Sequence, residues 1–141
     1  MRNEEDDKLR ILIVESGKLP YTAEIESKLD VFRELVGGDI EMIGLDRDTF
    51  LYCNAEGKLL GLPGNRRLDD GDIVAGTFIL LRDDGTGIEA SLTDGQIEKY
   101  MARFQETEQY TAKEVENMSL MSIQTYSKTE DFEEAEDDLE R

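Results

Sequence analysis

The sequence contains no histidine, and this absence excludes several kinds of functional site at once. Catalytic triads and dyads that use an imidazole base cannot form, and neither can metal sites with imidazole ligands. Cys53 is the one cysteine, so the chain forms no internal disulfide and no thiolate zinc cluster. Because it ends the apolar run Phe50–Cys53, we interpret it as a small buried hydrophobic residue rather than a nucleophile.

Basic residues are scarce: 16 Lys and Arg stand against 34 Asp and Glu, for a net charge of −18. Direct binding to nucleic acid or to an anionic membrane requires a basic surface, so we expect neither. Two explanations of the acidity remain. It serves solubility, which is the commoner use of net charge, or it occupies the basic nucleic-acid-binding groove of a partner protein.

Long apolar runs are also missing. The first residues are acidic and polar, with no apolar stretch of the kind found in signal peptides, and no run approaches the length that spans a membrane. We therefore expect a cytoplasmic protein in a reducing compartment.

The length of 141 residues is about that of one domain. From Gln105 to the end, nine Glu and three Asp stand against Lys113, Lys128 and Arg141, which is a net charge of −9. Segments with so much charge and so few apolar residues bury too little surface to offset their ordering entropy. We predict one domain over residues 8–105 and an acidic, largely disordered arm over residues 106–141.

The first half of the domain alternates strands with one helix. The patterns predict strands at 10–15 and 21–26 joined as a hairpin, a helix from the N-cap Ser27 to Gly37, and strands at 39–45 and 49–53. Residues 54–57 are predicted to form a turn with Gly57 in the left-handed region, followed by a strand at 58–62.

The second half is predicted to hold a loop at 63–67, a turn at 69–71, one long central strand at 73–81 and a turn at 83–87. Thr93 and Gln96 form a capping box before a helix whose apolar stripe consists of Ile97, Tyr100, Met101 and Phe104. A weak helix at 112–123 and an acidic tail at 130–140 follow. Since few helices alternate with the strands, we predict an α+β fold with a small mixed or antiparallel sheet and two helices.

The strongest candidate binding site is the loop from Pro63 to Arg67. Arg66 and Arg67 are the only adjacent basic pair, and glycine-rich turns with arginine forks bind phosphate or carboxylate. We take Asn65, Arg66 and Arg67 as the ligand-binding residues and Asn54, Lys58 and Tyr21 as possible neighbours. The alternative is that Pro, Gly and Asn form the turn while both arginines pair with acids such as Asp69 and Asp70.

Other chemistry finds less support. The stretches 69–72 and 83–85 resemble fragments of calcium loops but lack the alternating acids and the final bidentate Glu, so we expect no metal and no cofactor. Glu15 and Glu41 lie in or beside predicted strands and are of interest as carboxylates if they are buried. Hydrophobic residues scattered through the acidic arm are typical of segments that order on a partner, or they belong to a solubilising tail.

Three stretches together resemble the family known as domain of unknown function 3846. They are Ile13–Pro20, Val36–Glu41 and the Asn-x-Glu-Gly-Lys-Leu-x-Gly-Leu-Pro-x-Asn-Arg run at 54–66, and Gly76 also fits the pattern. The resemblance covers about Arg10 to Phe104. It implies an accessory protein of phages, plasmids or other mobile elements, and by analogy an inhibitor of host defence that mimics DNA or sequesters a nucleotide.

Two functional hypotheses follow. The first is a non-enzymatic binding protein of a mobile element whose acidic surface engages a nucleic-acid-handling host protein. The second is a nucleotide-binding protein that uses the loop at 63–67, which predicts that Arg66→Ala abolishes ligand binding and leaves the fold intact. No enzyme is expected, because no nucleophile–base pair can be named. The oligomeric state stays open.

Overall fold

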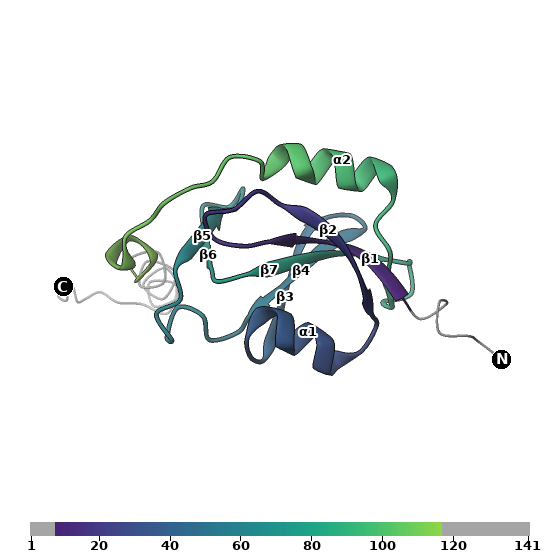
Figure 1. The fold of residues 1–141 in the computed structure, drawn as a ribbon, viewed down its shortest axis with the longest axis horizontal. Coiled ribbons are helices and arrows are strands. Elements are labelled where there is room, and N and C mark those ends of the chain that lie inside the picture. The colour runs from purple at the N-terminus through teal and green to yellow at the C-terminus, as the bar shows by residue number, and fades with distance from the viewer. Residues whose placement is uncertain (1–7, 117–141) are drawn as a thin grey trace, which may run out of the picture.

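A six-stranded antiparallel sheet forms the centre of the molecule in the computed structural model, which describes residues 8–116 (Figure 1). Strand β8 (Glu89–Ala90) pairs with the end of β7, and the other strands lie side by side. Their order is β2 (Tyr21–Glu26), β1 (Lys8–Val14), β7 (Phe78–Asp83), β4 (Thr49–Asn54) and β3 (Ile40–Asp46). A second sheet pairs β5 (Gly64–Arg67) with β6 (Ile73–Ala75). The predicted α+β class is confirmed.

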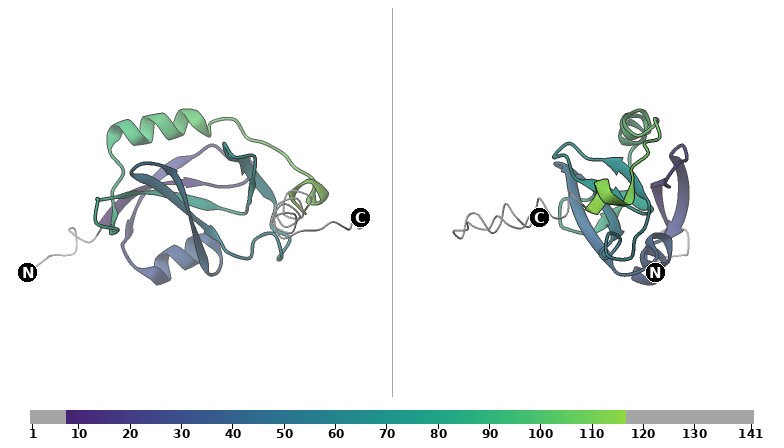
Figure 2. Two further views of the ribbon diagram at one scale, coloured as in Figure 1. Left: turned by 180° about the vertical axis from the view of Figure 1, so that it is seen from behind. Right: turned by 90° about the vertical axis from the view of Figure 1, so that its left-hand side faces the viewer.

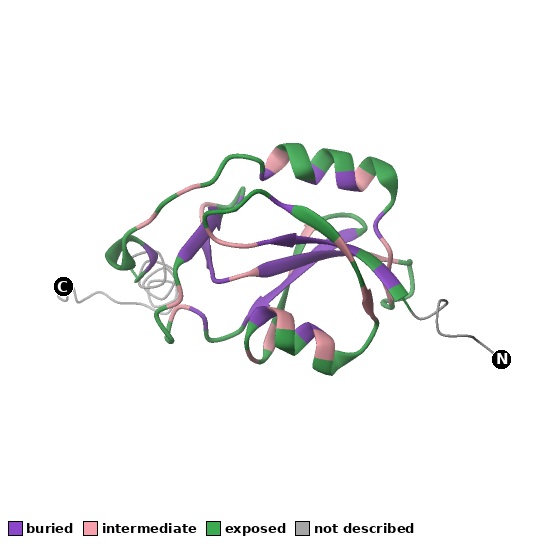
Figure 3. Ribbon diagram, in the orientation of Figure 1, coloured by how far each residue is buried: buried purple, intermediate pink, exposed green. Residues whose placement is uncertain are grey.

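Helices α1 (Leu29–Val36) and α2 (Asp94–Arg103) cover opposite faces of the main sheet (Figures 1 and 2). Because side chains alternate along a strand, each central strand supplies both faces and is buried along most of its length (Figure 3). Leu12, Leu51 and Leu80 pack toward α2, whereas their neighbours Ile11, Tyr52 and Ile79 pack toward α1. The continuously apolar runs in the sequence reflect this burial on two sides.

The local signals for hairpins and helix ends mostly hold. Strands β1 and β2 form the predicted hairpin, with Ile13 opposite Tyr21. Helix α2 begins with the predicted Thr93–Gln96 capping box, and Gly37 ends α1 in the left-handed region. The N-cap of α1 is Lys28 rather than Ser27, and no side chain caps it. Of the predicted stripe on α2, only Met101 stays exposed.

The predicted strand at 73–81 is wrong, because it is two strands in two sheets. Gly76, with φ of 89°, turns the chain after β6, and its N–H donates to the carbonyl of Pro63 at 2.8 Å. Only a glycine adopts this backbone conformation without strain. The predicted loop at 63–67 is likewise a strand, β5, from Gly64 onward.

The turn after β4 also differs from its prediction. Residues 58–62 form no strand; residues 55–61 form a compact helical turn in which Leu60 N–H donates to the carbonyl of Glu56 at 2.9 Å. Gly57 does not have a positive φ. A glycine is nevertheless required at position 57, because a Cβ there would lie 2.6 Å from the carbonyl oxygen of Ala75. The turn therefore packs directly against β6.

The ordered chain continues past the predicted boundary at residue 105. Val115 is buried against Ile73 and Ala75 of the small sheet, with Tyr110 partly buried beside it. Residues 112–116 are helical, and Thr111 and Glu114 cap them reciprocally. The remainder of the helix predicted at 112–123, and the acidic tail, lie outside the described residues. No helix within residues 8–116 is long and apolar enough to cross a membrane.

Candidate functional site

Arg66, the central residue of the predicted anion site, is completely buried at 0 % exposure. Its Nε donates to the carbonyl oxygen of Phe104 at 3.1 Å, and its Nη2 donates to the same oxygen and to the carbonyl of Lys18, each at 2.8 Å. Burial lowers the pKa of the guanidinium, although the nearby Glu108 charge opposes this. The guanidinium thus joins the end of α2 to the β1–β2 hairpin.

Asn65 is equally buried and belongs to the same network. Its Nδ2 donates to the carbonyls of Val14 at 2.9 Å and Gly76 at 3.0 Å, and its Oδ1 accepts from Arg66 Nη1 at 2.7 Å. A β-bulge between Gly64 and Arg66 explains how two successive side chains both point inward, since a regular strand would turn one of them outward. From β5, Asn65 and Arg66 therefore connect β1, the turn at Gly76 before β7, and the end of α2.

Arg67 is exposed and stands apart from its neighbour. Its guanidinium lies 5.4 Å from the ring centroid of Tyr110 and donates to the carbonyl of Gly71 at 3.0 Å. Neither arginine forms the expected ion pair with Asp69 or Asp70 within the described chain; Arg103 is the partner of Asp69, at 3.1 Å.

Tyr21 does not join the other predicted residues. It lies at the β1–β2 hairpin, where its hydroxyl donates to Glu15 and where Lys18 pairs with the same carboxylate at 3.2 Å. The hydrogen bond to Glu15, reinforced by burial, raises the pKa of Tyr21 to about 12. Glu15 itself is half-buried, and Glu41 is exposed.

Asn54 and Lys58 do come together, at the rim of an open pocket of about 430 Å3. The pocket lies between β3, the end of β4, the turn at 55–61 and β6. Asn54 holds the turn in place, because its Oδ1 accepts from Glu56 N–H at 2.8 Å and its Nδ2 donates to the carbonyl of Val36 at 3.2 Å. Lys58 forms an ion pair with Asp72.

Cys53 lines this pocket and is 5 % exposed. Burial, followed by the charges of Glu41 and Asp72, raises the pKa of its thiol to about 12. A thiol with that pKa stays protonated at neutral pH and is a poor nucleophile. The interpretation of Cys53 as a small buried residue is thus confirmed.

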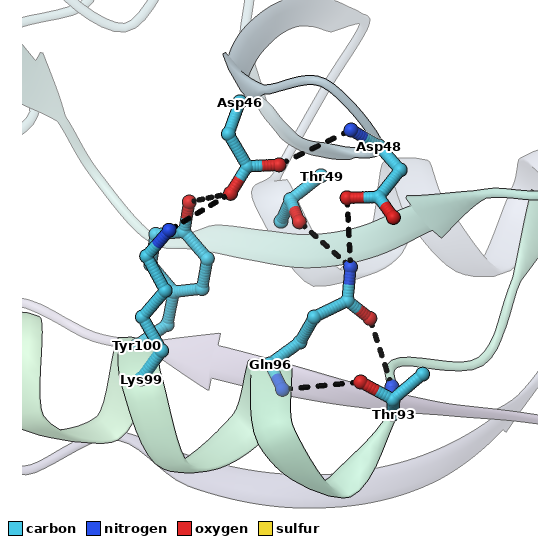
Figure 4. A network of polar contacts seen from close by, with 7 residues as sticks. All are labelled: Asp46, Asp48, Thr49, Thr93, Gln96, Lys99 and Tyr100. Atoms are coloured by element: carbon cyan, nitrogen blue, oxygen red, sulfur yellow. Dashed lines mark hydrogen bonds and ion pairs between the residues drawn. The ribbon is translucent and has the colours of Figure 1, made fainter.

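A separate polar network ties α2 to the β3–β4 turn (Figure 4). Asp46 accepts from the Tyr100 hydroxyl at 2.5 Å and from Lys99 at 3.2 Å, while Gln96 donates to Thr49 at 2.8 Å. A β-bulge between Gly44 and Asp46 lets the carboxylate reach α2. Burial raises the pKa of Asp46, but hydrogen bonds to its carboxylate from Tyr100, Thr49, the Asp48 backbone and Lys99 outweigh burial and hold the pKa well below the usual range.

We expect Tyr100→Phe to destabilise the protein by about 1.5 kcal/mol at neutral pH, because Asp46 loses a strong hydrogen bond. The folded-state pKa of Asp46 lies below its unfolded value, so this stabilisation is present above about pH 4 and is lost as the pH falls further. Urea unfolding at neutral and acidic pH measures the difference. In an Asp46→Asn background the same change should cost less; an equal cost there would contradict the assignment.

The two acidic turns have a structural explanation. In the turn at 69–72 the Asp70 carboxylate accepts from the N–H of Asp72 at 2.9 Å. The Asp83 carboxylate accepts from the N–H groups of Gly85 and Gly87, and Asp84 accepts from Thr86, which is ordinary turn chemistry. Within residues 8–116, no group of three or more acidic or cysteine side chains is placed to hold a metal ion.

The sequence matches the family described as Domain of unknown function (DUF3846) over residues 9–105. The chain belongs to this family. The match spans both helices and both sheets, so the DUF3846 domain corresponds to the structured body without the segment that carries Val115. No curated protein and no solved structure matches the chain.

The run at 54–66 that resembles the DUF3846 pattern has two structural parts. Residues 54–58 form the rim of the pocket, with Gly57 against β6. Asn65 and Arg66 form the buried network some residues later. The sequence predicts a single anion site from both parts, because nothing in the local pattern indicates that a bulge turns the side chains of Asn65 and Arg66 inward.

Proposed function

We propose that this DUF3846 protein is a non-enzymatic binding protein of a phage or mobile element, acting through its acidic surface on a basic, nucleic-acid-binding face of a host protein. The proposal rests on where the positively charged side chains lie in the structure. Arg66, the centre of the expected positive spot, is withdrawn from the surface into the fold. What faces solvent is therefore more acidic than the sequence alone indicates.

Most of the other cations in the described chain are also engaged. Ion pairs of 4 Å or less hold seven of them against carboxylates: Arg10, Lys18, Lys28, Arg33, Lys58, Lys99 and Arg103. Arg82 donates to the carbonyl of Ser91 instead. Since acidic residues exceed basic ones two to one in the sequence, carboxylates remain in excess. Such an excess favours association with a basic surface.

The side chains present also support a binding role rather than a catalytic one. The sequence supplies no histidine base, and the one thiol is buried and protonated. The alternative of nucleotide binding through the loop at 63–67 needs an accessible Arg66, and that guanidinium already donates to protein oxygens. No observation in the described residues favours that alternative.

The test is capture from nuclease-treated bacterial lysate on the full-length protein, followed by release with salt or with duplex DNA. We expect a captured protein to dissociate as salt rises, because screening shortens the reach of surface charge from about 10 Å at 0.1 M to about 3 Å at 1 M. We also expect duplex DNA to compete, since it needs the same basic face. A captured protein that stays bound in high salt and ignores DNA would refute the mechanism.

A further inference from the structure

The proposed function leaves unexplained a pocket between β3, β4 and β6. Buried residues, among them Cys53 and Val74, form its lining on the side of the core, and the turn at 55–61 forms one wall. Its volume of about 430 Å3 is enough for one large side chain or a small ligand. The thiol of Cys53 has no hydrogen-bond partner within residues 8–116, although it is buried there.

The charge of the pocket selects a cation. Glu41, Glu56 and Asp72 line it together with a single positive group, Lys58. That ammonium already pairs with Asp72, so two carboxylates remain in excess. Within the described chain, neither the Glu41 nor the Glu56 carboxylate has a hydrogen bond or an ion pair. A phosphate or another anion would be repelled here, whereas a guanidinium would gain two unused partners.

The apolar surface around these charges favours a cation with a hydrocarbon stem. Ile43 and Val74 line the interior, and Leu59 stands at the rim with 88 % of its surface exposed. Its neighbour Leu60 is 59 % exposed. Large apolar side chains so exposed beside a pocket are typical of interaction sites. A stem of methylene groups packs on such walls while its charged head meets the carboxylates.

We propose that this pocket receives an arginine side chain from the basic surface of the partner protein. The inference rests on the proposed function and adds the chemistry of its anchor. Arginine fits better than lysine, because its planar fork matches carboxylates in a bidentate way and is more weakly hydrated. Arginines seated in central pockets commonly contribute much of the energy of a protein–protein interface.

The first arm of the experiment uses the full-length protein and a short peptide with one arginine, compared with the same peptide carrying citrulline. Citrulline keeps the shape of the side chain and removes its charge. We expect the arginine peptide to shift the backbone amide NMR signals of the turn at 55–61 and of β6, and the citrulline peptide to leave them in place. Equal shifts with both peptides, or shifts confined to other elements, would overturn the inference.

Variants then assign the carboxylates. Glu41→Gln and Glu56→Gln should each weaken binding of the arginine peptide about two- to fivefold, the effect of losing one exposed charge partner. Glu34→Gln is the matched control, since Glu34 is exposed on α1 and does not line the pocket. Unchanged melting temperatures show that the variants remain folded. Undiminished affinity in Glu41→Gln and Glu56→Gln would refute the site.

The second arm separates the two proposals. The Glu41→Gln/Glu56→Gln double variant should capture its lysate partner more weakly than the Glu34→Gln/Glu98→Gln control, although each pair of changes removes two carboxylate charges. Glu98 is exposed on α2 and, like Glu34, does not line the pocket. Equal capture by all variants, still released by salt and DNA, would leave the acidic-surface mechanism standing and reject the pocket. Peptide binding at the pocket with no salt- and DNA-sensitive capture would support the site and reject the host-protein mechanism.

Discussion

Arg66→Ala is expected to remove most of the stability of the domain. The change leaves a cavity and strips charge-assisted hydrogen bonds from three acceptors: the buried oxygens of Phe104 and Asn65 and the partly buried carbonyl of Lys18. Unpaired buried acceptors cost about 1–3 kcal/mol each, and the cavity adds to this, so we expect a total loss of about 4 kcal/mol or more. For a domain near one hundred residues, this lowers the melting temperature by about 15–30 °C. Thermal unfolding followed by circular dichroism measures it.

The adjacent arginine supplies the control. Arg67→Ala removes the same side chain from an exposed site where it contacts Tyr110, and it should cost less than about 1 kcal/mol. Arg66→Lys keeps the charge but loses the fork, so it should rescue little. A melting temperature for Arg66→Ala within a few degrees of wild type would contradict the structural role and return Arg66 to the ligand-binding hypothesis, which requires an intact fold.

Gly57→Ala is expected to displace the turn at 55–61 from the small sheet. The added Cβ would lie 2.6 Å from the carbonyl oxygen of Ala75, and a backbone atom in a strand cannot give way as a side-chain tip can. Overpacking of this kind costs about 1–3 kcal/mol. Urea unfolding gives the loss of stability, and the amide signals of β6 should shift because the pocket changes shape.

Gly44→Ala is the comparison for this substitution. A Cβ at Gly44 meets no atom within 4 Å, and its φ is not positive. It should leave stability the same or raise it slightly, because alanine restricts the unfolded chain. If Gly57→Ala behaved as mildly as Gly44→Ala, the close packing between the turn and β6 would be wrong.

Local patterns predicted the elements whose cause is local. Alternation and turn residues located the β1–β2 hairpin, and the capping box located the start of α2. They failed where a distant contact decides the conformation. Residues 73–81 read as one strand because both halves are buried, and only the pairing of β6 with β5 separates them at Gly76.

For the same reason, only part of the candidate site could be predicted from the sequence. Asn54 and Lys58 occur in a turn whose position follows from the sequence, and both line the pocket. The inward direction of Arg66 depends on a bulge and on carbonyls supplied by α2 and the β1–β2 hairpin, 38 and 48 residues away. Glu41 was of interest only as a strand carboxylate, because its place opposite the turn at 55–61 requires the pairing of β3 with β4.

The position of β7 between β1 and β4 also determines how the chain must fold. The hairpins β1–β2 and β3–β4 pair residues that are close in sequence, but Leu12 and Leu51 reach Leu80 only when β7 enters between them. Pairing over such sequence distances makes folding slow. During synthesis, the edges of β1 and β4 that pair with β7 have no partner until residue 83 has emerged, so we expect interrupted chains shorter than this to be the species most prone to aggregate.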